Sequence, residues 1–141
     1  MKILLDTNIV LDLLMDRLPF ADAASELFSW VEVGAITGYL CGSTITTVHY
    51  LASKAVGAPR VQEEIGKLLH VFEVAPVNRQ VLESALSAGF SDFEDAVIHE
   101  AARHVGAEAI VTRSNAKDFK RSRIPVYSSD EMAKIVGGMK G

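Results

Sequence analysis

The sequence predicts an α/β protein, a three-layer α/β/α sandwich built around a central, mostly parallel sheet of about five strands. Short apolar runs typical of strands alternate with stretches of helical periodicity along nearly all of the 141 residues. Consecutive parallel strands need crossover connections of this kind. A hydrophobic content of 49% with 23% charged residues is that of an ordinary globular protein. We expect residues 1–136 to form a single domain and the glycine-rich residues 137–141 to form a frayed tail.

The first half of the chain opens with a strand and a helix. Ile3–Leu5 is apolar and ends at Asp6-Thr7-Asn8, which favours the start of a helix. Ile9, Leu13 and Leu14 follow at helical spacing. Beyond them we expect a helix over 21–33, a strand over 35–41, a helix capped by Ser43-Thr44 that runs to about 54, further helix over 61–69 and a strand over 71–74.

The second half contains the most clearly amphipathic helix, over 91–105, where Phe93, Val97, Ala101 and Val105 are four residues apart. Ser91 and Glu94 fit a capping box at its start. The other elements expected here are a helix over 78–88, a strand over 109–112, a short strand over 124–127 that Pro125 assigns to a sheet edge, and a last helix from Ser128.

Acidic residues follow the strands at the positions where an α/β sheet binds its ligands. Asp6 ends the first strand, and Asp118 comes shortly after the strand over 109–112. Asp92 and Asp95 occupy the first turn of the amphipathic helix, and their spacing of three puts them on one face. Because ligands bind beyond the carboxyl ends of parallel strands, we expect these carboxylates to converge.

Each acid alone also has a structural explanation. Asp6 can be a helix cap, and Asp92 and Asp95 are favoured by the dipole at a helix N-terminus. Together, however, three carboxylate-bearing segments repel one another unless a cation neutralises them. Oxygen ligands without a Cys/His cluster suit Mg²⁺ or Mn²⁺, and such ions serve phosphodiester hydrolysis. No serine–histidine or cysteine–histidine arrangement competes, and Cys41 is expected in the core.

The charge distribution bears on the substrate. A net charge of −4 argues against a non-specific coat for nucleic acid. One stretch nevertheless gathers five of the 14 basic residues, and it is either a solvated turn or a site for substrate phosphates: Arg113, Lys117, Lys120, Arg121 and Arg123. The single cysteine and the lack of an apolar run of ~20 residues predict a cytoplasmic protein without a membrane span.

Four segments carry a resemblance to a known family: Leu4-Leu5-Asp6-Thr7-Asn8, Ser43-Thr44-Ile45-Thr46, Asp92-Phe93-Glu94-Asp95-Ala96, and Thr112-Arg113-Ser114-Asn115 followed by Asp118-Phe119. In this order they resemble the PIN-domain family, in particular the VapC-like toxins of toxin–antitoxin pairs. The resemblance implies a Mg²⁺- or Mn²⁺-dependent endoribonuclease that hydrolyses RNA phosphodiester bonds. It also implies a homodimer and an antitoxin protein as partner.

The resemblance assigns roles residue by residue. The metal ligands would be Asp6, Asp95 and Asp118, with Asp92 as an auxiliary catalytic acid. Four residues would orient ligands or substrate: Thr7, Asn8, Thr112 and Asn115. The basic residues expected to bind RNA are Arg113, Lys117, Lys120 and Arg121.

One position departs from the family pattern, which is Ser-x-x-Thr-x-x-Glu in the second segment. His49 occupies the place of the glutamate. A neutral imidazole either lines the site, where it binds Mn²⁺ better than Mg²⁺, or hydrogen-bonds a neighbouring aspartate. In either case the affinity for Mg²⁺ should be lower. The alternative function is therefore a catalytically weakened PIN-like RNA-binding or protein-interaction module. An aspartyl-phosphate phosphatase is less consistent, because it needs an aspartate where Asn8 stands.

Overall fold

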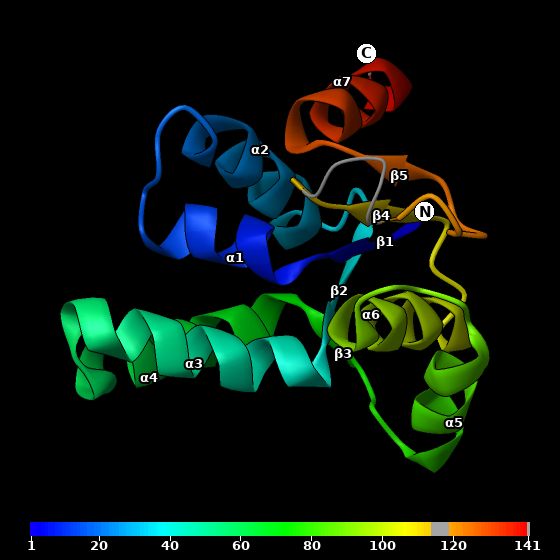
Figure 1. Ribbon diagram of the computed structural model, residues 1–141. Coiled ribbons are helices and arrows are strands. Elements are labelled where there is room, and N and C mark those ends of the chain that lie inside the picture. The colour runs from blue at the N-terminus through cyan, green and yellow to red at the C-terminus, as the bar shows by residue number, and fades with distance from the viewer. Residues whose placement is uncertain (114–118, 141) are drawn as a thin grey trace.

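The computed structural model describes residues 1–113 and 119–140. In these residues five strands form one sheet in the order β3-β2-β1-β4-β5, and every neighbouring pair is parallel. The strands are β1 (Lys2–Leu5), β2 (Thr37–Cys41), β3 (Glu73–Ala75), β4 (Ala109–Val111) and β5 (Val126–Tyr127). The predicted α/β fold with a parallel five-stranded sheet is confirmed (Figure 1).

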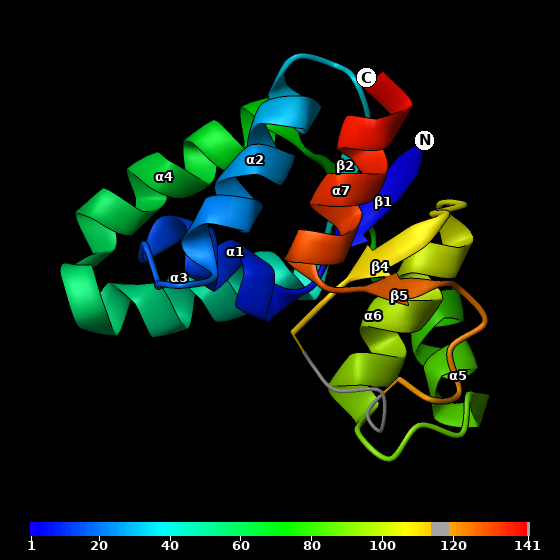
Figure 2. The ribbon, with the colours of Figure 1, turned by 90° about the horizontal axis from the view of Figure 1, so that it is seen from above.

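Seven helices of the described residues surround the sheet: α1 (Thr7–Leu14), α2 (Ala21–Glu32), α3 (Gly42–Val56), α4 (Ala58–Val71), α5 (Arg79–Ser87), α6 (Phe93–His104) and α7 (Ser129–Lys140). Helices α1, α2 and α7 lie on one side of the sheet, and α5 and α6 pack together on the other (Figure 1). Helices α3 and α4 form a hairpin beside α1 that projects away from the sheet (Figure 2).

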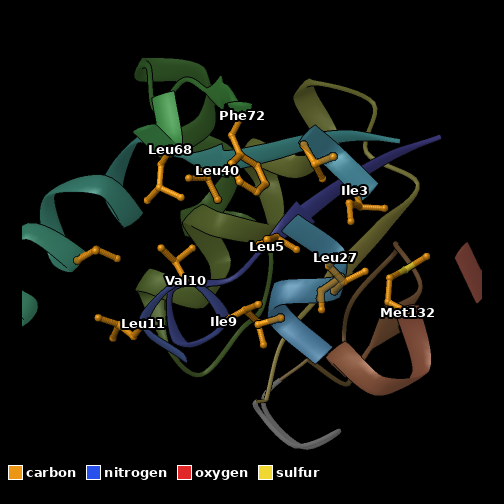
Figure 3. Packing of buried hydrophobic residues seen from close by; sticks show 14 of the residues in the cluster. Ile3, Leu5, Ile9, Val10, Leu11, Leu27, Leu40, Leu68, Phe72 and Met132 are labelled. Atoms are coloured by element: carbon orange, nitrogen blue, oxygen red, sulfur yellow. The ribbon is translucent and has the colours of Figure 1, made fainter. Parts of the chain in front are cut away.

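The central strand β1 is buried on both faces. Ile3 and Leu5 point into the core formed with α1, α2 and α7, where Ile9, Leu27 and Met132 meet them (Figure 3). Leu4, between them, belongs to the second core, under α5 and α6. A continuous apolar run is what a strand covered by helices on both faces requires.

Two helix starts differ from the prediction. Helix α3 begins at Gly42 with Cys41 at its N-cap and no side-chain cap, because the buried Thr44 hydroxyl is used in a hydrogen bond to Thr7. Helix α6 is capped by Asp92, whose Oδ1 accepts the Asp95 N–H at 2.9 Å, so the predicted Ser91–Glu94 capping box is wrong. An aspartate is as good an N-cap as serine, and here it lies one residue further on.

The C-terminal part of the chain contains the last strand and the last helix. A capping box does form at Ser128, whose Oγ accepts the Glu131 N–H at 3.1 Å while its own N–H donates to Glu131 Oε1 at 2.9 Å. Helix α7 then continues through Gly137 and Gly138 to Lys140. The edge position predicted for the last strand is confirmed. No helix in the described part of the chain is long and apolar enough to cross a membrane.

Candidate functional site

Asp6 lies where β1 ends and α1 begins, at the carboxyl end of the central strand. Its backbone N–H still donates to the Val111 carbonyl of β4 at 2.9 Å. Its side chain is 4% exposed. Oδ1 accepts the Thr7 N–H at 2.7 Å, which makes Asp6 the N-cap of α1, and Oδ2 accepts the Thr112 hydroxyl at 2.6 Å. The carboxylate is therefore fixed in position by the start of α1 and by the residue that follows the neighbouring strand β4.

This environment disfavours the charged form of Asp6. Burial is the largest cause and raises the pKa of its carboxyl group. The hydrogen bonds from Thr112 and Thr7 oppose that shift, and the negative charge of Asp92 adds to it. Each carboxylate oxygen has a second lone pair available beyond these bonds. A cation bound at Asp6 would offset both the burial of its carboxylate and the negative charge of Asp92.

The start of α6 lies close enough to the end of β1 for the negative charge of Asp92 to act on Asp6. Asp92 is exposed, whereas Asp95, one turn into α6, is half-buried. The third predicted ligand, Asp118, lies outside the described residues, as do Asn115 and Lys117. Within the part of the chain that the structure describes, no group of three or more His, Cys, Asp or Glu residues is arranged to hold a metal ion.

A polar network supports Asp6. The Thr7 and Thr44 hydroxyls are 2.9 Å apart, which joins α1 to the first turn of α3. The Asn8 amide donates to Thr112 Oγ1 at 3.5 Å, and Asn8 Oδ1 accepts the Arg113 N–H at 3.2 Å. The predicted supporting residues Thr7, Asn8 and Thr112 therefore lie in one network around Asp6.

The two histidines considered from the sequence differ in their surroundings. His49 is half-buried on α3, and it makes no hydrogen bond or ion pair with any other described residue. His99 is buried in α6, where its Nδ1 lies 2.6 Å from Glu100 Oε2 and its Nε2 accepts the Arg123 N–H at 3.0 Å. Since Nε2 accepts, the proton is on Nδ1 and donates to Glu100. His99 is thus a fully hydrogen-bonded structural residue.

One important pair was missed in the sequence. Asp12, which is completely buried in α1, accepts two hydrogen bonds from Arg113, from Nε at 2.7 Å and Nη2 at 2.9 Å. The same guanidinium lies 4.2 Å from the centre of the Phe20 ring. The signal was present, because Asp12 follows Ile9 by three residues and so shares its buried face. Arg113, predicted to bind RNA, has its guanidinium engaged inside the protein, whereas Lys120 and Arg121 are exposed.

A parallel sheet with a buried carboxylate at the carboxyl end of its central strand defines an α/β domain with an acidic residue where such sheets bind their ligands. The family model described as "PIN domain" matches residues 2–116, and the chain belongs to the PIN-domain family. Members of this family are typically nucleases and generally depend on a metal ion.

Solved structures of toxin–antitoxin proteins share the fold. The chain is 25% identical to a toxin–antitoxin complex from Klebsiella pneumoniae, with a TM-score of 0.67 over 89% of this chain and 96% of that one. VapBC2 from Rickettsia felis, bound to a DNA fragment from its promoter, gives 18% identity and a TM-score of 0.68 over 91% and 98%. VapC20 from Mycobacterium tuberculosis, a toxin that cleaves the sarcin–ricin loop, gives 17% and 0.62 over 77% and 86%. No curated protein sequence matches the chain.

Proposed function

We propose that this protein is a metal-dependent endoribonuclease that hydrolyses RNA phosphodiester bonds. The observation that carries the proposal is the buried Asp6 carboxylate, held by Thr7 and Thr112 beside the acidic start of α6. Membership in the PIN-domain family and the likeness to VapC toxins support the same conclusion.

The acidic residues and their hydrogen-bond partners would have separate roles in the reaction. Asp6 and Asp95, with Asp118, would hold Mg²⁺ or Mn²⁺, which supplies charge stabilisation at the scissile phosphate and an acidified water. Thr112 and the Thr7 N–H fix the orientation of the Asp6 carboxylate, as hydrogen bonds to a ligating carboxylate commonly do. Asp92 raises the negative charge next to Asp6 and so strengthens attraction for the cation.

The cellular role follows from the relatives. We infer that the protein is the toxin of a toxin–antitoxin pair, acting in the cytoplasm as a homodimer that a partner antitoxin restrains. The solved complexes from Rickettsia felis and Klebsiella pneumoniae contain antitoxins, which supports such a partner. The basic residues Lys120 and Arg121 are exposed and available to RNA.

Cleavage of a panel of structured RNAs tests the activity. The wild type should cleave with Mn²⁺ or Mg²⁺ and stop in EDTA, and Asp95→Asn should lower the rate by at least about 100-fold, since loss of even an outer-shell contact costs about 10–100-fold. Glu94→Gln is the matched control, because it removes a neighbouring but exposed charge and should leave the rate unchanged. Absence of cleavage with either metal would favour the alternative, a PIN-like module that binds RNA or protein.

The alternative of a PIN-like binding module is based on His49, which replaces the usual glutamate, and a substitution at this position tests it. His49→Glu should tighten Mg²⁺ binding by roughly tenfold, because a carboxylate adds a hard, charged ligand where the imidazole adds none. His49→Gln is the control for loss of the ring without gain of charge. Titration calorimetry measures both, and an unchanged Mg²⁺ affinity in His49→Glu would show that this position does not line the site.

A further inference from the structure

A pocket lies between α5, α6 and residues 121–123. It has a volume of about 260 Å³. Three arginines and two serines on its wall define it, and we call it the arginine pocket: Arg103, Arg121, Arg123, Ser84 and Ser87. The metal site described above uses none of these residues.

The arginine pocket has unbalanced positive charge. Glu100 is the one acidic residue among its described lining residues. Its carboxylate is already committed, with Oε1 3.0 Å from Arg103 Nη1 and Oε2 2.6 Å from His99. Two guanidinium groups therefore face the pocket without a carboxylate partner from its lining, in a protein whose net charge is −4. Converging like charges are unfavourable unless an anion is bound.

The chain holds these arginines in place. The Arg123 N–H donates to the buried Nε2 of His99 at 3.0 Å, and Ser122 Oγ bonds both the carbonyl and the N–H of Ile124, at 2.6 and 3.1 Å. The Arg121 side chain lies against Gly89, where an added Cβ would come within 3.3 Å of Arg121 Cδ. The backbone that presents the arginines is thus fixed before any ligand arrives, which lowers the cost of binding.

The pKa of His99 is affected by the positive charge of the arginines in the pocket. Burial is the main cause that lowers the pKa of its ring; the Glu100 carboxylate opposes the shift, and the positive charges of Arg103 and Arg123 add to it. The neutral ring leaves the guanidinium groups as the charged donors of the pocket.

The position of the arginine pocket relates it to the metal site. Asp95, His99 and Arg103 follow one another at four-residue intervals and lie along one side of α6. Arg103 lies eight positions after Asp95, which corresponds to about 12 Å along the helix axis. A few nucleotides of single-stranded RNA span this distance. Arginine is the preferred partner for phosphate because its planar fork donates two parallel hydrogen bonds.

We propose that the arginine pocket binds a backbone phosphate of the RNA, a few nucleotides away from the bond that is cut. This proposal rests on the proposed function. It adds a second contact between the protein and the RNA, which determines how the RNA strand lies across α6. Free inorganic phosphate or a nucleotide presents the same chemistry, so the experiment separates these sources.

Binding is measured in an Asp95→Asn background, so that a single-stranded RNA 12-mer stays intact. Arg121→Gln and Arg123→Gln, which remove the two guanidinium groups without a carboxylate partner, should each weaken 12-mer binding by about fivefold and reduce its salt slope by about one. Arg60→Gln on α4 is the control with the same charge change, far from α5 and α6 (Figure 1), and it should leave the slope unchanged. Amide NMR spectra with inorganic phosphate, without metal, report whether Ser84, Ser87 and Arg103 shift.

The outcomes separate the two proposals. Loss of RNA affinity in both arginine variants supports the arginine pocket even if the wild type cleaves no RNA, in which case the nuclease proposal alone fails. Unchanged affinity and slope in both variants, with an active wild type, overturns the arginine pocket alone. Phosphate-induced shifts combined with unchanged RNA affinity also overturn it, because the pocket would then serve a free anion.

Discussion

At the scale of single residues, the ion pair of the buried Asp12 with the partly exposed Arg113 connects parts of the candidate site. Asp12 is inaccessible to solvent in α1, whereas Arg113 keeps 29% of its side chain exposed just after β4. The pair joins segments 101 positions apart in the chain, and Arg113 at the same time donates its backbone N–H to Asn8. The ion pair therefore holds the end of β4, and with it Thr112, against α1 and Asp6.

The two partners should respond unequally to substitution. Arg113→Met leaves a carboxylate buried without its cation and should lower the free energy of unfolding by about 3–5 kcal/mol. Asp12→Leu leaves only a partly exposed guanidinium and should cost less. Urea denaturation of both variants and of the double Asp12→Leu/Arg113→Met variant measures this, and the double variant should recover most of the loss of Arg113→Met. Equal losses in the two single variants would contradict the asymmetry.

At the scale of elements, β2 depends on a glycine for its packing against α2 and against Phe72 at the end of α4. A Cβ at Gly38 would lie 2.6 Å from two ring atoms of Phe72 and 2.9 Å from Val31 Cγ2. Phe72 is 4% exposed and packs against Phe28, with ring centres 5.9 Å apart, so it has little room to move (Figure 3). The glycine therefore permits the close approach of α2 and Phe72 to the sheet.

Gly38→Ala should lower the free energy of unfolding by about 1–3 kcal/mol through overpacking, as measured by thermal or urea denaturation. The matched control is Gly66→Ala in α4, where an added Cβ meets nothing within 4 Å. Because alanine favours a helix over glycine by about 0.5–1 kcal/mol, this control should be neutral or stabilising. If Gly38→Ala raised the free energy of unfolding, the Phe72 ring would have to move aside and make room for the added methyl group, which would contradict the prediction.

The sequence predicts an element well where residues close together in the chain determine it, and poorly where distant residues do. The apolar runs, the helical stretches between them and Pro125 are local features, and they predicted the five parallel strands and the edge position of β5. The cap of α6 was misplaced by one residue because Ser91 and Asp92 are equally good caps, and tertiary packing chooses between them. Asp6, Asp92 and Thr112 were predicted to meet since strand ends converge. The Asp12–Arg113 pair was missed because the spacing that places Asp12 on the buried face of α1 does not identify its partner, which lies 101 positions away in the sequence.

At the scale of the whole molecule, His99 links α6 to the segment that leads into β5, and its protonation state couples this link to pH. In the native protein Nε2 accepts the Arg123 N–H, and protonation there would replace the acceptor with a second donor. Glu100, Arg103 and Arg123 are the charged groups that act on the ring, and burial outweighs Glu100, so the pKa of His99 lies below its usual 6.5. The unfolded chain therefore takes up a proton at this residue before the native one does.

The sign of the pH dependence follows from that order. The contribution of His99 to stability is fully present above pH 6.5 and is lost as the pH falls from there toward the lowered pKa, at no more than about 1.4 kcal/mol per pH unit. Urea denaturation at pH 7.5, 6.5 and 5.5 should show a steeper loss in the wild type than in His99→Gln, whose side chain stays neutral and still donates and accepts. All other titrating groups are common to both proteins, so their effects cancel in the comparison. Parallel pH profiles for the two proteins would mean that the pKa of His99 is the same in the native and unfolded states, and would contradict the lowered pKa.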